Sequence, residues 1–167
     1  MSENSGKLLT QFITKDRIVD IDHWIQKYPD DQKQSAVMSA LRIVQEQHQH
    51  LTPELMDAVA EYLDMPPIAV YEVATFYSMY EHAPTGRHLV NVCTNISCKL
   101  RGSHEIVEQL KKKLHVGLGE TTADGRFTLR EVECLGACVN APMMQVDKDY
   151  HEKLDSQKIN EVLDEYK

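Results

Sequence analysis

The four cysteines of this 167-residue chain fall into two close pairs. Four residues separate Cys93 from Cys98, three separate Cys134 from Cys138, and 35 residues lie between the pairs. Cysteine thiolates are ligands for structural zinc and for iron–sulfur clusters. Two close pairs far apart in sequence therefore predict one site built from four thiolates.

The spacing within each pair narrows the choice of metal group. Zinc sites use cysteines two to four residues apart, so spacing alone leaves zinc open. Cubane clusters of the bacterial ferredoxin type use C-x2-C runs, which this chain lacks. A Rieske centre needs two histidine ligands close behind its cysteines, and no histidine occupies those positions. A [2Fe-2S] cluster with two thiolates at each iron fits the wider loops, and small side chains at Gly136 and Ala137 let backbone N–H groups approach sulfur.

Two further roles for the cysteines fit the sequence less well. Structural disulfides require an oxidising compartment, and residues 1–16 contain neither a signal peptide nor a transit peptide. A thioredoxin-type redox dithiol requires a C-x-x-C motif, which is absent. The favoured interpretation is a [2Fe-2S] site, with structural zinc as the alternative.

Three segments around the cysteines resemble a known family. They are VCTNISCKLRG at 92–102, ETTADGRFTL at 120–129 and VECLGACVNAPMMQV at 132–146. They are similar to the thioredoxin-like [2Fe-2S] subunits of respiratory NADH–quinone oxidoreductase, the bacterial complex I. VYEVATFYSMY at 70–80 and PTGRH at 84–88 extend the resemblance. It implies a [2Fe-2S] cluster with Cys93, Cys98, Cys134 and Cys138 as its ligands.

The resemblance also implies partners and a place in the cell. It implies a flavoprotein subunit that binds FMN and NADH, and a larger iron–sulfur subunit of the same proton-translocating complex. This chain would then be a non-autonomous subunit with no NADH site of its own. Its expected place is the cytoplasmic side of the inner membrane, in the peripheral arm. Similar subunits of NAD-linked hydrogenases and formate dehydrogenases, or a free thioredoxin-like ferredoxin, remain alternatives.

Composition agrees with a globular protein that contacts other proteins. Hydrophobic residues make up 42% and charged residues 26% of the chain. The net charge of −8 disfavours nucleic acid and anionic membrane surfaces as partners. No stretch approaches the ~20 apolar residues that span a bilayer.

The first half of the chain shows helical periodicity in four segments. Thr14 and Thr52–Pro53 are predicted to begin the first and third helices, and Pro66–Pro67 to begin the fourth. The second helix is predicted over about 34–48. The apolar faces comprise Ile18, Ile21, Ile25 and Tyr28; Val37, Ala40, Leu41 and Val44; Leu55, Met56, Val59, Ala60 and Leu63; and Val70, Val73 and Ala74. These short helices predict a small helical bundle over residues 1–83.

The pattern changes at residues 83–86, Ala-Pro-Thr-Gly, where we place a domain boundary. Strands are predicted at 88–92 and 127–132, each ending just before a cysteine pair, with a helix between them that Ser103 caps. Such a strand–helix–strand unit forms a right-handed parallel crossover, which brings both cysteine pairs to one end of the sheet. Strands near 143–146 and 150–153 and a C-terminal helix capped by Asp155 complete a thioredoxin-like domain over residues 84–167. The expected fold class is α+β, a helical bundle followed by a thioredoxin-like α/β domain.

Other candidate features favour structural roles. His48 and His50 lie in a polar context without matching ligands, which is typical of a solvated helix end. The aromatic segment 76–80 is typical of a core or an interface, and it is our expected contact with the flavoprotein. Gly117 and Gly119 follow a helix and lack a third glycine, so they form no dinucleotide fingerprint.

Two expectations concern the surroundings of the cysteines. Acidic residues at Glu131, Glu133, Asp147 and Asp149 are expected near the site, where they would lower the reduction potential of a cluster. Pro142 occupies the place of the proline that is often cis before the third strand of thioredoxin-like folds.

Overall fold

The computed structural model describes residues 8–166 and divides into two compact units, with the division between Pro84 and Thr85. Each unit has its own buried apolar cluster. The prediction that residues 1–16 contain no signal peptide falls partly on residues 1–7, which lie outside the described residues. Within residues 8–166, no helix combines the length and the apolar character needed to cross a bilayer.

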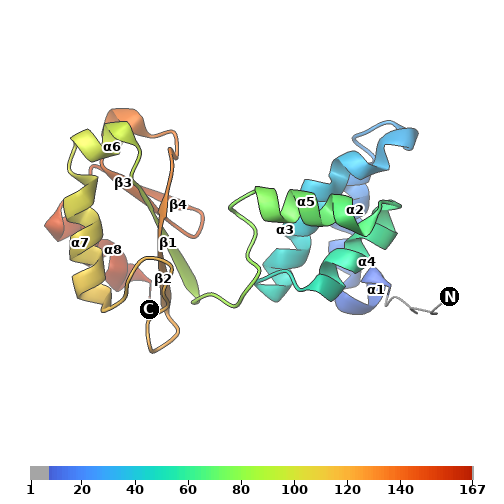
Figure 1. Ribbon diagram of the computed structural model, residues 1–167, viewed down its shortest axis with the longest axis horizontal. Coiled ribbons are helices and arrows are strands. Elements are labelled where there is room, and N and C mark those ends of the chain that lie inside the picture. The colour runs from blue at the N-terminus through green and yellow to red at the C-terminus, as the bar shows by residue number, and fades with distance from the viewer. Residues whose placement is uncertain (1–7, 167) are drawn as a thin grey trace. The chain divides into compact units, whose positions relative to one another are not determined.

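The first unit is built from helices (Figure 1). Their apolar faces form one core that includes Ile21, Leu41, Val59 and Val70, as the periodicity predicts. The prediction was wrong for Tyr28, which lies beyond the end of α2 and is exposed. The helices are α1 (Leu9–Phe12), α2 (Lys15–Ile25), α3 (Val37–His48), α4 (Pro53–Leu63) and α5 (Pro67–Phe76), with a 3-10 segment, η1 (Asp30–Ala36), before α3. The sequence missed α1, and it placed the start of the second helix inside the 3-10 segment.

The predicted helix starts differ in how they are capped. The Thr52 hydroxyl accepts a hydrogen bond from the N–H of Leu55 at 3.4 Å, and Pro53 is the first residue of α4. Thr14 occupies the cap position of α2, but its side chain makes no capping bond. Its own N–H instead donates to the Gln47 side chain at 3.1 Å.

The second unit contains a mixed four-stranded sheet in the order β2-β1-β3-β4. β1 pairs in parallel with β2, from His88 opposite Phe127 to Cys93 opposite Val132. β3 is antiparallel to both β1 and β4. The strands are β1 (His88–Cys93), β2 (Phe127–Val132), β3 (Met143–Val146) and β4 (Asp149–Glu152). The predicted parallel crossover between β1 and β2 is therefore confirmed.

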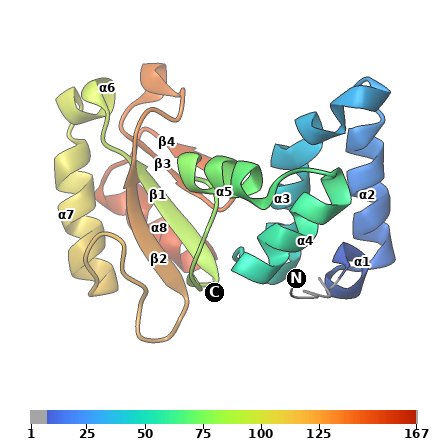
Figure 2. The ribbon, with the colours of Figure 1, turned by 45° about the vertical axis from the view of Figure 1, so that its right-hand side comes forward.

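Helices α7 (Ser103–Leu114) and α8 (Ser156–Glu165) cover one face of this sheet (Figures 1 and 2). Alternate strand residues on that face, such as Val90, Leu129 and Val146, form a single buried cluster with both helices. The Asp155 side chain caps α8 by accepting from the N–H of Lys158 at 2.8 Å, as predicted. At α7 the prediction was wrong by one position, because Gly102 is the cap, with φ of 92°, and Ser103 is a buried helical residue.

The start of the sheet depends on a close contact between Gly86 and β2. The N–H of Gly86 donates to the buried hydroxyl of Thr128 at 2.6 Å, and that hydroxyl also bonds Thr121 Oγ1 at 2.8 Å. A Cβ at Gly86 would lie only 2.7 Å from the carbonyl carbon of Phe127. The chain therefore requires glycine at 86 for its approach to the β2 backbone.

Candidate metal centre

The first cysteine pair is held by the end of β1 and a short helix. Cys93 is the last residue of β1, and Cys98 lies in α6 (Ile96–Leu100), which the sequence missed. Asn95 begins this helix, because its Oδ1 accepts from the N–H of Ile96 at 2.8 Å. Both cysteines are buried, so this pair forms the inner half of the site.

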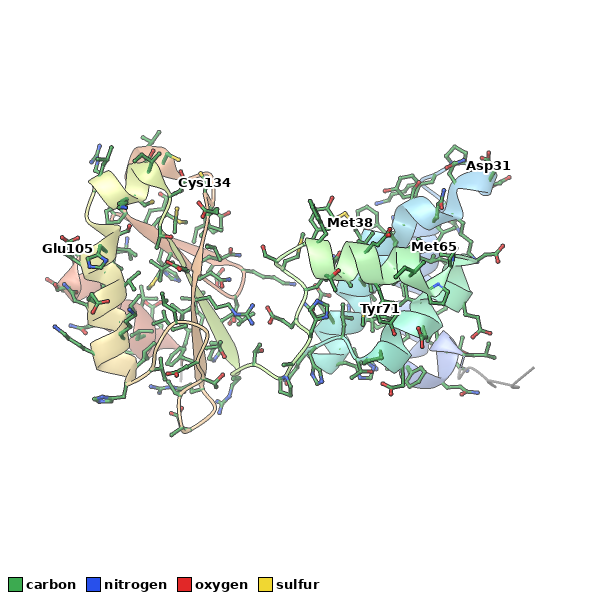
Figure 3. All side chains as sticks on the ribbon, in the orientation of Figure 1. Asp31, Met38, Met65, Tyr71, Glu105 and Cys134 are labelled. Atoms are coloured by element: carbon green, nitrogen blue, oxygen red, sulfur yellow. The ribbon has the colours of Figure 1, made fainter. Side chains whose placement is uncertain are left out.

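The second pair lies on a loop with little regular structure. Cys134 follows β2 by two residues, and Cys138 begins a single 3-10 turn, η2 (Cys138–Asn140). Their sulfurs are 3.4 Å apart, and the N–H of Gly136 donates to Cys134 Sγ at 3.4 Å. Gly136 has φ of 86°, which glycine adopts readily. Both cysteines are exposed; Figure 3 labels Cys134.

The parallel pairing of β1 and β2 brings the two pairs together. Cys93 is opposite Val132, so β1 and β2 end at the same end of the sheet, and the two cysteine loops begin side by side. Cys98 is hydrogen-bonded to Cys93 and also interacts electrostatically with Cys138 of the other loop. The predicted convergence of the four thiols at one end of the sheet is what the structure shows.

The thiols disfavour one another's ionisation. Burial raises the pKa of Cys98 to about 11, and its hydrogen bond with Cys93 adds to this, while the N–H of Met143 acts in the opposite direction. The hydrogen bond with Cys134 is the main reason that the pKa of Cys138 is raised, and the Ser97 hydroxyl opposes it. Four neighbouring thiolates need a compensating cation, so this donor set fits a metal group.

The two close pairs of thiols can supply two ligands to each of two metal ions. Structural zinc needs four ligands around one ion, whereas a [2Fe-2S] cluster with four cysteines has two thiolates for each iron. The donor set therefore fits the binuclear cluster predicted from the spacing.

Side chains from β4 support the second cysteine loop. The Tyr150 hydroxyl donates to the Leu135 carbonyl at 2.8 Å, and Asn140 Nδ2 donates to Glu152 Oε2 at 2.6 Å. The N–H of Lys153 donates to the Asn140 carbonyl at 2.7 Å. The loop then joins β3 through the Ala141–Pro142 bond, which is cis, as the fold analogy suggested.

The expected acidic surroundings are only partly present. Asp147 accepts from the N–H of Leu89 at 2.9 Å and pairs with His88 at 2.7 Å. His88 and Leu89 lie at the start of β1, so Asp147 is at the end of the sheet opposite to Cys93. The expectation was wrong for Asp147 and Asp149, because the antiparallel β3 carries the chain away from the cysteines. Glu133 does lie beside the site, where it accepts from Asn95 at 2.8 Å.

The other candidate residues have local structural roles. His48 is half-buried, and its Nε2 lies 2.9 Å from the Phe12 carbonyl oxygen, so it joins α1 to the end of α3. Tyr80 is a core residue whose hydroxyl donates to the Met38 carbonyl at 2.9 Å. The N–H of Gly117 donates to Glu120 Oε2 at 2.6 Å, and the N–H of Gly119 donates to the Leu129 carbonyl at 2.7 Å. These two N–H groups are therefore not available to a phosphate.

Comparisons with known proteins agree with this site. The family model of thioredoxin-like [2Fe-2S] ferredoxins matches residues 21–167. The E subunit of the NADH-quinone oxidoreductase of Rickettsia felis is 46% identical over 143 residues, which are 85% of this chain and 86% of the relative. The mitochondrial NADH dehydrogenase [ubiquinone] flavoprotein 2 of Dictyostelium discoideum is 43% identical over 155 residues, covering 92% of this chain and 63% of the relative.

A solved structure shares the fold at low sequence identity. An NAD+-reducing [NiFe]-hydrogenase in the H2-reduced state superposes with a TM-score of 0.67 and 18% identity over 78% of this chain. The chain spans only 22% of that hydrogenase chain. This likeness is therefore one of fold alone.

Proposed function

The chain belongs to the thioredoxin-like [2Fe-2S] ferredoxin family, and from this we propose that it is the electron-transfer subunit of an NADH–quinone oxidoreductase. The observation that carries the proposal is the convergence of two cysteine pairs at one sheet edge, in a chain 46% identical to such a subunit. We propose Cys93, Cys98, Cys134 and Cys138 as the ligands. A bound [2Fe-2S] cluster supplies one-electron chemistry.

The protein around the cysteines has a positioning role. β1 and β2 fix where the two loops begin, burial of Cys93 and Cys98 keeps water from the inner pair, and N–H groups of Met143 and Gly136 donate to sulfur. Such donors stabilise negative charge on the ligands and thereby raise the reduction potential of an iron–sulfur site.

NADH oxidation itself belongs on a partner in this proposal. NADH gives up a hydride, so a flavin is needed to pass its two electrons on singly. We propose that the partner is a flavoprotein subunit that binds FMN and NADH, and that a larger iron–sulfur subunit continues the path. We propose that this chain lies in the peripheral arm of that complex, on the cytoplasmic side of the membrane.

We propose residues 1–83 as a docking domain and residues 84–167 as the cluster domain. The surface near the end of α5 carries large exposed apolar side chains: Phe76 is 79% and Met79 55% exposed. Exposed apolar residues close in sequence are typical of protein interfaces. Tyr80, which belongs to the aromatic segment expected at this contact, is excluded because it is buried. A free diffusible ferredoxin would have no use for such a docking domain.

Two measurements test the proposal. The isolated chain is expected to show no NADH oxidation, and addition of the cognate flavoprotein is expected to give NADH-dependent bleaching of its visible absorbance. NADH oxidation by the chain alone would contradict the carrier role.

The docking surface has a matched control on another helix. Replacing Phe76 and Met79 with serine is expected to weaken capture of the flavoprotein by about tenfold or more, as loss of interface anchors does. Val19, an apolar residue of α2 that is 64% exposed, provides the control, because Val19→Ser removes exposed apolar surface elsewhere. Equal capture by all three proteins would remove the α5 surface from the interface and leave the electron-carrier role standing.

A further inference from the structure

We propose that Asn95 is a positioning residue of the cluster site, whose side chain joins the two cysteine loops and holds the two thiol pairs in register. Asn95 Nδ2 donates to Glu133 Oε2 at 2.8 Å. Asn95 lies between Cys93 and Cys98, and Glu133 directly precedes Cys134. This inference rests on the proposed function, because the pairs need a fixed register only if one cluster binds both.

The contact continues the β1–β2 pairing beyond the end of the sheet. The last paired positions are Cys93 and Val132, and the N–H of Thr94 then donates to the Val132 carbonyl at 3.0 Å. Beyond that bond the two segments separate, and each continues into its cysteine loop. The next link between them is the side-chain bond from Asn95 to Glu133.

Both ends of the Asn95 amide are used, which fixes its orientation. Its Oδ1 accepts from the N–H of Ile96 and so begins the short helix that carries Cys98. Its Nδ2 therefore faces Glu133, and a single side chain sets the start of α6 and the path of the second loop. A charged acceptor makes this hydrogen bond stronger than one between neutral groups.

A second contact crosses in the same place. The Ser97 hydroxyl, one residue before Cys98, donates to Cys138 Sγ of the other loop. The remaining support of the second loop comes from β4, through Tyr150 and Glu152. The exposed pair is thus held from one side by β4 and from the other by the first cysteine loop.

Three variants separate the hydrogen bond from the charge of Glu133. Asn95→Asp keeps the oxygen that caps α6 but replaces the donor with a carboxylate facing Glu133, so the link breaks. Glu133→Gln removes the charge but keeps an oxygen that accepts from Asn95. The double variant restores a link of reversed polarity, because the new amide donates to the new carboxylate, and it restores the net charge.

The readout is the rate at which visible absorbance is lost from the holoprotein in excess chelator, with the melting temperature measured alongside. Asn95→Asp is expected to lose the cluster about fivefold faster than wild type, the effect of one exposed charge-assisted hydrogen bond. Glu133→Gln and the double variant are expected to stay within about twofold of wild type. The midpoint potential should fall in Asn95→Asp, rise in Glu133→Gln and return in the double variant, since it follows net charge.

The outcomes separate this inference from the proposed function. Iron and sulfide in the wild-type protein support the function whatever the variants do. Cluster loss from Asn95→Asp at the wild-type rate, or a double variant no slower than Asn95→Asp, overturns the positioning role of Asn95. Faster loss in Asn95→Asp, with a wild-type rate in Glu133→Gln and recovery in the double variant, establishes it. An effect of charge alone would make Glu133→Gln slower than wild type, and a general structural weakening would not be repaired by reversing the polarity of one bond.

Discussion

Thr128 provides a sharp test of how the cysteine-bearing unit is held together. Its side chain is 2% exposed, and its hydroxyl accepts from the buried N–H of Gly86 at 2.6 Å. Valine has nearly the same shape as threonine but no acceptor. Thr128→Val therefore keeps the packing and leaves the Gly86 N–H without its partner.

The magnitude follows from that stranded donor. A buried donor that loses its partner costs about 1–3 kcal/mol, so we expect Thr128→Val to lower the free energy of unfolding by about 2 kcal/mol. Thr121, the other partner of the hydroxyl, is exposed and is expected to turn to water at little cost. For a unit of this size the change corresponds to a fall in melting temperature of roughly 8–16 °C.

Thr128→Ser is the matched control. It keeps the hydroxyl and removes one buried methyl group, which costs about 0.8 kcal/mol. The assay is urea unfolding followed by cluster absorbance for this unit and by far-ultraviolet circular dichroism for the whole chain, because two units can unfold separately. A free energy of unfolding for Thr128→Val within about 0.5 kcal/mol of wild type, below the range for a buried donor without a partner, would contradict this role of the hydroxyl, as would a larger loss in Thr128→Ser.

Three further predictions concern other contacts. Gly86→Ala is expected to destabilise the same unit by about 1–3 kcal/mol in urea unfolding, because its Cβ would meet the Phe127 backbone at 2.7 Å, and wild-type stability would show that the strand shifts freely. Tyr62→Phe removes the hydroxyl that donates to Asp22 at 2.5 Å and is expected to cost about 1 kcal/mol at pH 7. Burial, with help from Asp22, raises the pKa of Tyr62 from 10.0 to about 12, so this contribution is complete below pH 10 and is lost as pH rises through 12; a difference that persists unchanged above pH 12 would refute it. Burial lowers the pKa of His151 below 6.5, so its neutral form favours the fold above pH 6.5 and this stability is lost as pH falls. His151→Gln should therefore lose less stability than wild type between pH 7 and pH 5 in thermal unfolding, and equal losses would exclude that role.

Much of the fold was predictable because its signals are local. Thr52–Pro53 and Asp155 mark helix starts through contacts within three residues of themselves, and both caps are present in the structure. A short apolar-rich segment before Cys93 and the turn at Asp124–Gly125 predicted β1 and β2, and the geometry of parallel crossovers then placed both cysteine pairs at one end of the sheet.

The features that the sequence missed depend on tertiary contacts. Helix α6 is five residues long, which is too short for a periodic signal. Its cap residue, Asn95, lies between two cysteines and was not recognised as a helix start. The bond between Asn95 and Glu133 joins residues 38 positions apart, and only the register of β1 against β2 brings them together. Asp147 was placed near the cluster because it follows the strand that leaves the second cysteine loop, but the direction of β3 takes it to the other end of the sheet.

The most direct test of the electron-carrier function is the iron, zinc and acid-labile sulfide content of the purified chain, measured with its visible spectrum. We predict a red-brown protein with about two irons and two sulfides per chain and no zinc, and loss of both iron and sulfide when Cys93, Cys98, Cys134 or Cys138 is replaced by serine. One zinc per chain without sulfide, or an unaltered spectrum after replacement of these cysteines, would contradict it.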